Sequence, residues 1–72
     1  MEQTTACVIS LNGKETPLAA GMTIDDFLAL QSLQGKLVVV EINGAIVPRS
    51  DFSSRVFDAG DQVEIVHFVG GG

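Results

Sequence analysis

The chain ends in three consecutive glycines, Gly70, Gly71 and Gly72, which follow the apolar residue Val69. Glycine has no side chain, so these residues can pass through a narrow opening and bring the terminal carboxylate to another protein. Glycine also loses more conformational entropy than other residues when it becomes ordered, which makes a glycine run unsuited to holding structure. The residues alone therefore allow two interpretations: a frayed chain end, or a tail that presents the Gly72 carboxylate for chemistry.

The other residue types that support catalysis are isolated in the sequence. His67 is the only histidine, and no second histidine or nearby cysteine could complete a metal site with it or orient it as an acid or base. Cys7 is the only cysteine and lies in an apolar segment, where a free thiol usually packs as a small hydrophobic side chain. Asp25 and Asp26 are adjacent in an expected helix and do not face each other. We therefore expect a protein that is not an enzyme and that binds no cofactor or metal.

The composition favours one small domain with an acidic surface. Hydrophobic residues make up 46% of the 72-residue chain, and the formal net charge is −5. The basic residues are scattered along the sequence: Lys14, Lys36, Arg49 and Arg55. Nucleic-acid-binding proteins carry basic side chains gathered in a patch or stripe, so we do not expect DNA or RNA as a partner.

No sequence feature indicates a membrane or an oxidising compartment. Residues 1–5 lack the basic and then apolar profile of a signal peptide. The longest apolar run, residues 37–40, is far too short to cross a bilayer. A single cysteine forms no intramolecular disulfide. We therefore expect a cytoplasmic protein without a membrane partner.

The N-terminal segments predict a β-hairpin. Apolar residues alternate over residues 6–11, as in a strand with one buried face. Asn12 and Gly13 follow, and this pair is a strong signal for a two-residue turn because both positions need a positive φ. Residues 14–18 form the returning strand, which is polar and carries Pro17, as an edge strand can.

A helix is predicted to begin at Thr23, which is a preferred N-cap residue. Asp26 stands three residues later, where its carboxylate can complete a capping box with Thr23. We expect the helix to end at Gly35, because glycine favours the left-handed conformation that follows a last turn. The buried stripe comprises Ile24, Phe27 and Leu28, extended by Leu30 or Leu33.

Three more strands are expected in the second half of the chain, at residues 37–42, 45–47 and 62–68. An Asn-Gly turn joins the first two of them. Residues 49–57 are expected to be irregular, with three candidates for the core: Phe52, Val56 and Phe57. The sequence leaves open which face of the 37–42 strand is buried, because a shift of one residue exchanges the two faces.

The order of hairpin, helix, strand, short strand and strand predicts an α+β fold, with one helix packed on a mixed sheet of four to five strands. If the first and last strands pair in parallel at the centre of the sheet, the arrangement is a β-grasp. We expect this domain to span residues 1–68. The last strand then continues directly into a flexible glycine tail at residues 69–72.

The last strand also predicts a contact surface for another protein. Because side chains alternate along a strand, Val66 and Phe68 face away from the helix if Val63 faces it. Apolar side chains on an open face beside a reactive tail indicate a docking surface. The alternative is that Phe68 folds back over an edge of the core.

Two blocks of the sequence resemble the sulfur-carrier proteins of thiamine biosynthesis, the ThiS family, which have a ubiquitin-like β-grasp fold. Residues 40–49 read Val-Glu-Ile-Asn-Gly-Ala-Ile-Val-Pro-Arg. Residues 58–72 read Asp-Ala-Gly-Asp-Gln-Val-Glu-Ile-Val-His-Phe-Val-Gly-Gly-Gly. The Gly-Met-Thr-Ile helix entry at residues 21–24 also fits, so the resemblance spans nearly the whole chain.

The resemblance implies a specific use for the tail. In that family an ATP-dependent activating enzyme, an adenylyltransferase, adenylates the terminal carboxylate, which here belongs to Gly72. Sulfur from a protein persulfide, often supplied by a cysteine desulfurase, then replaces AMP and leaves a thiocarboxylate. Thiazole synthase takes that sulfur into the thiazole ring. Gly70 and Gly71 would permit access, and Val66 and Phe68 would help docking.

Three alternatives remain open at this point. A molybdopterin sulfur carrier uses the same tail chemistry with a different acceptor. A ubiquitin-like modifier would instead join its tail to lysines of target proteins. A β-grasp interaction module with an inert tail would do neither.

Overall fold

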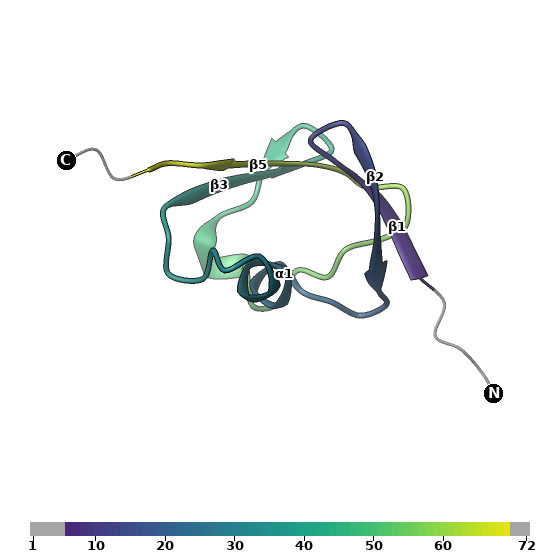
Figure 1. Ribbon diagram of the computed structural model, residues 1–72, viewed down its shortest axis with the longest axis horizontal. Helices are drawn as coiled ribbons and strands as arrows, with labels where there is room; N and C mark the ends of the chain where they lie inside the picture. Colours follow the sequence, from purple (N-terminus) through teal and green to yellow (C-terminus); the bar gives the residue numbers. More distant parts are fainter. Residues whose placement is uncertain (1–5, 70–72) are drawn as a thin grey trace.

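The computed structural model describes residues 6–69, which form one helix lying across a curved sheet (Figure 1). The elements are β1 (Ala6–Leu11), β2 (Lys14–Ala19), α1 (Ile24–Leu30), β3 (Val38–Ile42), β4 (Ala45–Ile46), a 3₁₀ turn (Arg49–Asp51) and β5 (Gln62–His67). The strands form one five-stranded sheet in the order β2-β1-β5-β3-β4. The predicted α+β fold, with one helix on a mixed sheet, is confirmed.

The predicted hairpin forms the right-hand part of the sheet in Figure 1. Asn12 and Gly13 have φ angles of 51° and 82°, as a two-residue turn with two positive φ angles requires. Leu11 pairs with Lys14 directly across this turn, and β2 continues one residue further than predicted, to Ala19. β2 lies at the outer edge of the sheet, where Pro17 is tolerated because no further strand needs its N–H.

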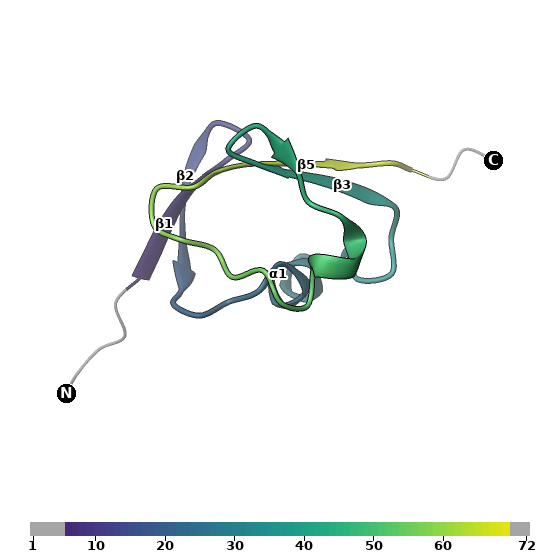
Figure 2. The same cartoon turned by 180° about the vertical axis from the view of Figure 1, so that it is seen from behind.

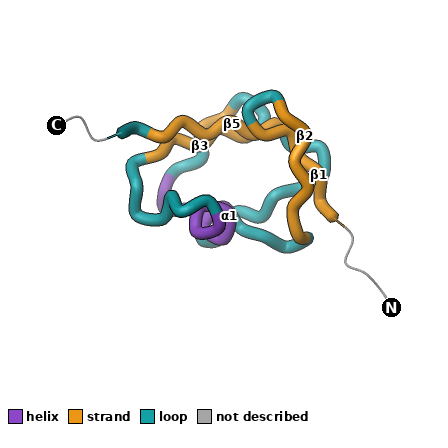
Figure 3. The backbone as a smooth tube through the Cα atoms, viewed as in Figure 1, coloured by secondary structure: helices purple, strands orange, loops and turns teal. Residues whose placement is uncertain are grey.

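β5 is the central strand of the sheet (Figure 3). On one side it pairs in parallel with β1, at Ser10 with Gln62 and at Leu11 with Val63. On the other side it pairs antiparallel with β3 over the whole of that strand. The first and last strands of the fold therefore lie side by side, which is the expected β-grasp arrangement.

The start of α1 follows the sequence prediction, but its end does not. Asp26 N–H donates to the Thr23 hydroxyl and the Asp26 carboxylate accepts from Thr23 N–H, both at 3.1 Å, which forms the predicted capping box. The helix ends at Leu30 rather than at Gly35, so the predicted end is wrong. Within residues 6–69, no helix is long and apolar enough to span a bilayer.

Ser32 explains the early end of α1. Its φ angle is 60°, and the N–H groups of Ser32 and Leu33 donate to the carbonyl oxygens of Ala29 and Leu28 at 3.1 and 2.8 Å. These two bonds are those of a Schellman motif, which reverses the chain and satisfies the last carbonyl groups of a helix. Leu33 then packs against the core, whereas Leu30 is 67% exposed. Of the two proposed extensions of the buried stripe, Leu33 is therefore the correct one.

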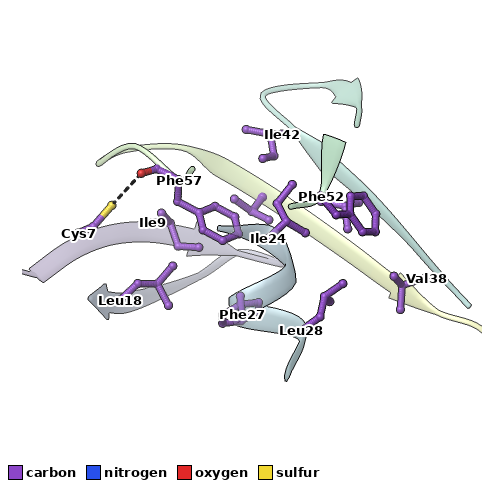
Figure 4. Packing of buried hydrophobic residues seen from close by; sticks show 12 residues of the cluster. Cys7, Ile9, Leu18, Ile24, Phe27, Leu28, Val38, Ile42, Phe52 and Phe57 are labelled. Carbon is purple, nitrogen blue, oxygen red and sulfur yellow. Dashed lines mark hydrogen bonds between the residues drawn. The ribbon is translucent and has the colours of Figure 1, made fainter. Parts of the chain in front are cut away.

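The core lies between α1 and the concave face of the sheet (Figure 4). It consists of Cys7, Ile9, Leu18, Ile24, Phe27, Leu28, Val38, Val40, Ile42, Phe52, Phe57 and Val63. Phe27 and Phe57 meet edge to face with their ring centroids 5.8 Å apart.

Phe52 and Phe57 are buried as predicted, but Val56 is 38% exposed, so its assignment to the core is wrong. Val56 forms an isolated β-bridge with Thr23. Because successive side chains alternate in such a segment and Phe57 points into the core, Val56 points outward.

A buried carboxylate anchors the beginning of β5. The Asp61 carboxylate accepts from the side-chain amide of Asn43 at 3.0 Å and from the backbone N–H of Asp58 at 2.9 Å. The Arg55 guanidinium lies 3.4 Å from the same carboxylate. The Asn43 side chain in turn accepts from the N–H of Gln62 at 2.9 Å. The turn between β3 and β4 and the turn before β5 are thereby held together.

Candidate functional site

β5 carries the chain from the core directly toward the C-terminal glycines. Val63 is buried beneath the sheet, while the strand continues alongside β3 away from the helix (Figure 2). The N–H of Phe68 still donates to the carbonyl oxygen of Leu37 at 2.9 Å. The last described residue, Val69, is therefore one residue beyond a backbone hydrogen bond of the sheet. Gly70, Gly71 and Gly72 lie outside the described residues, so their assignment to the site stays a prediction.

Apolar side chains gather on the open face of the sheet near the end of β5. Val66 and Phe68 are 52% and 50% exposed, and both face away from α1, as alternation from the buried Val63 requires. Val39 pairs with Val66 across the two strands, and Leu37 lies beside Phe68. We call these four residues, Leu37, Val39, Val66 and Phe68, the open-face patch.

Sequence reasoning missed Leu37 and Val39 as members of this patch. The segment is apolar on both faces, so its pattern does not distinguish the buried face from the open one. In the structure Val38, Val40 and Ile42 are buried, which places the alternate residues Leu37, Val39 and Glu41 on the open face. Once one residue of β3 is assigned to the core, strict alternation determines the others.

Two carboxylates border the open-face patch. Glu41 on β3 pairs directly with Glu64 on β5, and both side chains lie on the open face. Like charges directly opposite each other destabilise a sheet. The same arrangement creates a region of negative potential beside an apolar surface, which favours approach of a partner surface with basic side chains.

The remaining candidates from the sequence are not brought together. His67 is exposed on β5, while Cys7 is buried in β1 with its thiol 3.6 Å from the carbonyl oxygen of Phe57. The Asp26 carboxylate is engaged in the helix cap, and Asp25 lies in the same first turn. Within residues 6–69 there is no group of three metal-binding side chains.

A hollow of about 400 Å³ lies between the end of β2 and α1. It is lined by Ala19, Ala20, Gly21, Met22, Asp26, Ala29 and Leu30. Among the described residues of this lining Asp26 is the only ionisable one, and its carboxylate is already bound to the backbone of Thr23. The hollow therefore offers no pair of groups for acid–base catalysis.

Comparison with known proteins places the fold and the tail in one family. The model of the ThiS family matches residues 6–72 of the chain. The chain belongs to the ThiS family. The resemblance found in the sequence is confirmed. Sulfur carrier protein ThiS of Bacillus subtilis (strain 168) is 39% identical over 66 residues, which cover 90% of this chain and 100% of that protein.

Solved structures of the family have the same architecture. The crystal structure of thiamine biosynthesis protein ThiS from Geobacter metallireducens matches with a TM-score of 0.73 and 34% sequence identity. The match covers 90% of this chain and 99% of that chain. The ubiquitin-like β-grasp fold is thereby confirmed.

Two longer proteins also match the chain. Thiazole synthases of Paramagnetospirillum magneticum (strain ATCC 700264 / AMB-1) and Magnetococcus marinus (strain ATCC BAA-1437 / JCM 17883 / MC-1) are each 39% identical, over 62 and 64 residues. The matches cover 86% and 89% of this chain but only 19% and 20% of those proteins, so the chain spans about a fifth of their length. The Bacillus subtilis relative, which the match covers over its whole length, is named a sulfur carrier protein, in line with the expectation of a carrier rather than an enzyme.

Proposed function

We propose that this chain carries sulfur for the thiazole ring of thiamine, and that the sulfur is bound at the terminal carboxyl group of Gly72. The observation that carries this proposal is the family match, which extends through the last residue of the chain. The direct continuation of β5 toward the tail supports it, because a carrier must extend its reactive end from a stable body.

The proposed chemistry begins with activation of a poor electrophile. An ATP-dependent activating enzyme transfers AMP to the Gly72 carboxylate and releases pyrophosphate, which turns the carboxylate oxygen into part of a good leaving group. A protein persulfide, for example from a cysteine desulfurase, attacks the carbonyl carbon and displaces AMP. A second thiol then attacks the donor's sulfur in this acyl persulfide, so that a disulfide forms between the two thiol sulfurs and the thiocarboxylate is released. The activating enzyme binds the ATP. This chain contributes the carboxyl group and the tail that makes this group accessible to the enzyme.

Thiazole synthase is the proposed acceptor of the sulfur. Support comes from the two thiazole synthases in which a segment similar to this chain forms part of a longer protein. The reaction would take place in the cytoplasm, where thiols remain reduced.

The residues of the chain divide into two roles. Gly70 and Gly71 let the backbone enter the active site of a partner without side-chain obstruction, as part of a flexible tail at residues 69–72. Val66 and Phe68 act in docking, together with the rest of the open-face patch. Their exposure at the end of β5 supports this role, since an enzyme that binds Gly72 must approach that end of the molecule.

The test is to incubate the chain with the activating enzyme, ATP and a persulfide source and to measure its intact mass. We expect a mass increase that corresponds to exchange of one oxygen for sulfur. The product is then supplied to thiazole synthase and, separately, to molybdopterin synthase. Thiazole formation supports the proposal, whereas transfer to the pterin precursor alone supports the molybdopterin carrier. An unchanged mass, or conjugates to lysines of other proteins, would contradict the carrier function.

A further inference from the structure

The two edges of β5 are paired over different lengths (Figure 3). On the β3 edge the ladder extends from Ile42 and Val63 to Val38 and His67. On the β1 edge it includes only Gln62 and Val63 of β5, because β1 turns back at its hairpin. The second half of β5 therefore has a strand on one edge only.

The side chain of Asn12 extends the shorter ladder by one step. The backbone N–H of Asn12 donates to the carbonyl oxygen of Val63 at 2.8 Å. Its side-chain oxygen accepts from Ile65 N–H at 3.0 Å, and its side-chain nitrogen donates to the Ile65 carbonyl oxygen at 3.3 Å. The amide of Asn12 thus takes the place of the next peptide group of β1.

The backbone N–H and C=O groups of successive residues of β5 point alternately to the β1 edge and to the β3 edge. The carbonyl oxygens of Asp61, Val63 and Ile65 all accept bonds from β1 or from Asn12. Phe68, which has an even number, instead directs its N–H to Leu37, the residue before β3. His67 and then Val69 therefore direct their N–H and C=O groups to the β1 side, beyond Asn12. We call the backbone of these two residues the free edge, because no other residue within 6–69 forms a backbone hydrogen bond with it there.

The two outer edges of the sheet differ from the free edge. β2 carries Lys14, Glu15 and Pro17, and β4 has only two residues. Charges, proline and very short strands are the features that prevent an exposed edge from pairing with another chain. The free edge contains no proline and no acidic or lysine side chain, and it continues β5 instead of ending the sheet.

We propose that an extended segment of the activating enzyme adds to the free edge as a further strand when the tail enters the enzyme. This inference rests on the proposed function, because it requires an enzyme that acts on Gly72. Three residues separate Val69 from the chain end, and three extended residues span about 11 Å at most. Any enzyme that holds the Gly72 carboxylate must therefore lie against Val69 and its neighbours.

Covering the free edge without pairing it would be unfavourable. Backbone N–H and C=O groups that lose water need new hydrogen-bond partners, and strand addition supplies them in the geometry that β5 already has. Asn12 determines where the added strand can begin, because its amide occupies the preceding position on the edge. The added strand lies beside Phe68, so an apolar side chain on its open face would continue the open-face patch.

Hydrogen exchange of single backbone amides tests the proposal. In the free chain we expect fast exchange at His67 and Val69 and slower exchange at Phe68, whose N–H is bonded to Leu37. When the chain is saturated with the activating enzyme, exchange at His67 and Val69 should slow by on the order of tenfold or more. Unchanged exchange at both residues in the saturated complex would overturn the proposal.

Two variants of one residue provide a second test. Val69→Pro removes a backbone N–H of the free edge, whereas Val69→Ala shortens the side chain and retains that N–H. We expect the concentration that gives half-maximal adenylation to be on the order of tenfold higher for the proline variant than for the alanine variant. Thermal unfolding of both variants checks that the domain is intact. Equal half-maximal concentrations for the two folded variants would contradict the proposal.

The remaining outcomes separate this inference from the proposed function. Normal adenylation without protection of His67 and Val69 contradicts the added strand alone. Failure of the wild-type chain to be adenylated contradicts the proposed function itself, and this inference with it. Protection that rises with carrier concentration in the absence of enzyme would assign the free edge to a second copy of the chain and overturn the proposed partner.

Discussion

Glu41 and Glu64 pair directly across β3 and β5, on the face of the sheet opposite to the buried Val40, Ile42 and Val63. Like charges at directly paired positions disfavour a sheet, yet this pair borders the open-face patch, and Glu64 lies on the strand that leads to the tail. A charge pair that weakens the fold can still favour binding, because negative potential speeds the approach of a basic surface. The two effects can be measured separately.

Glu64→Gln should stabilise the domain by about 0.5 kcal/mol, because it removes the repulsion from Glu41. It should also slow association with the activating enzyme at low salt, and high salt should reduce the difference. Urea unfolding and stopped-flow binding measure the two quantities. Glu15→Gln is the matched control, since Glu15 pairs with the uncharged Ser10. If both variants gain equal stability, the repulsion between the facing pair is not the cause.

Gly72→Ala should severely impair adenylation while leaving the domain folded. The added methyl group would crowd the narrow opening through which the tail reaches the nucleotide, whereas the buried core consists of residues between Cys7 and Val63. Pyrophosphate release measures adenylation, and thermal unfolding measures stability. Wild-type adenylation by this variant would contradict the argument that access requires glycine.

Phe68→Ser should weaken binding of the activating enzyme by on the order of tenfold and destabilise the domain by only about 1 kcal/mol, because half of the side chain is already exposed. Titration calorimetry and urea unfolding give the two values. Val56→Ser is a suitable control, since Val56 is a partly exposed apolar residue outside the open-face patch. Equal losses of binding in both variants would indicate a general effect on the fold instead of a contact.

Ser32→Gly should stabilise the domain by roughly 0.5–1 kcal/mol, because Ser32 has a φ of 60° that glycine adopts without strain. Ser32→Ala should not give this gain, since alanine is strained in the same conformation. Chemical denaturation of the two variants provides the comparison. A stability order with alanine above glycine would show that the end of α1 is not limited by this backbone conformation.

The helix boundaries illustrate how far sequence reasoning extends. The capping box of Thr23 and Asp26 is local, so residue types three positions apart were sufficient to predict it. The helix end depends on the burial of Leu33, which packs against the core after Ser32 has reversed the chain. Because that packing involves residues distant in the sequence, the glycine at position 35 was a misleading signal.

The sequence by itself determined the local features of this protein: two Asn-Gly turns, the helix start, the β-grasp order of elements and the glycine run at residues 70–72. These features depend on the backbone preferences of a few adjacent residues. Only the tertiary structure decided which face of β3 is open and where the edge of β5 becomes free. Asn12 and Ile65 are 53 residues apart, and their pairing requires the packed core to bring β1 and β5 together.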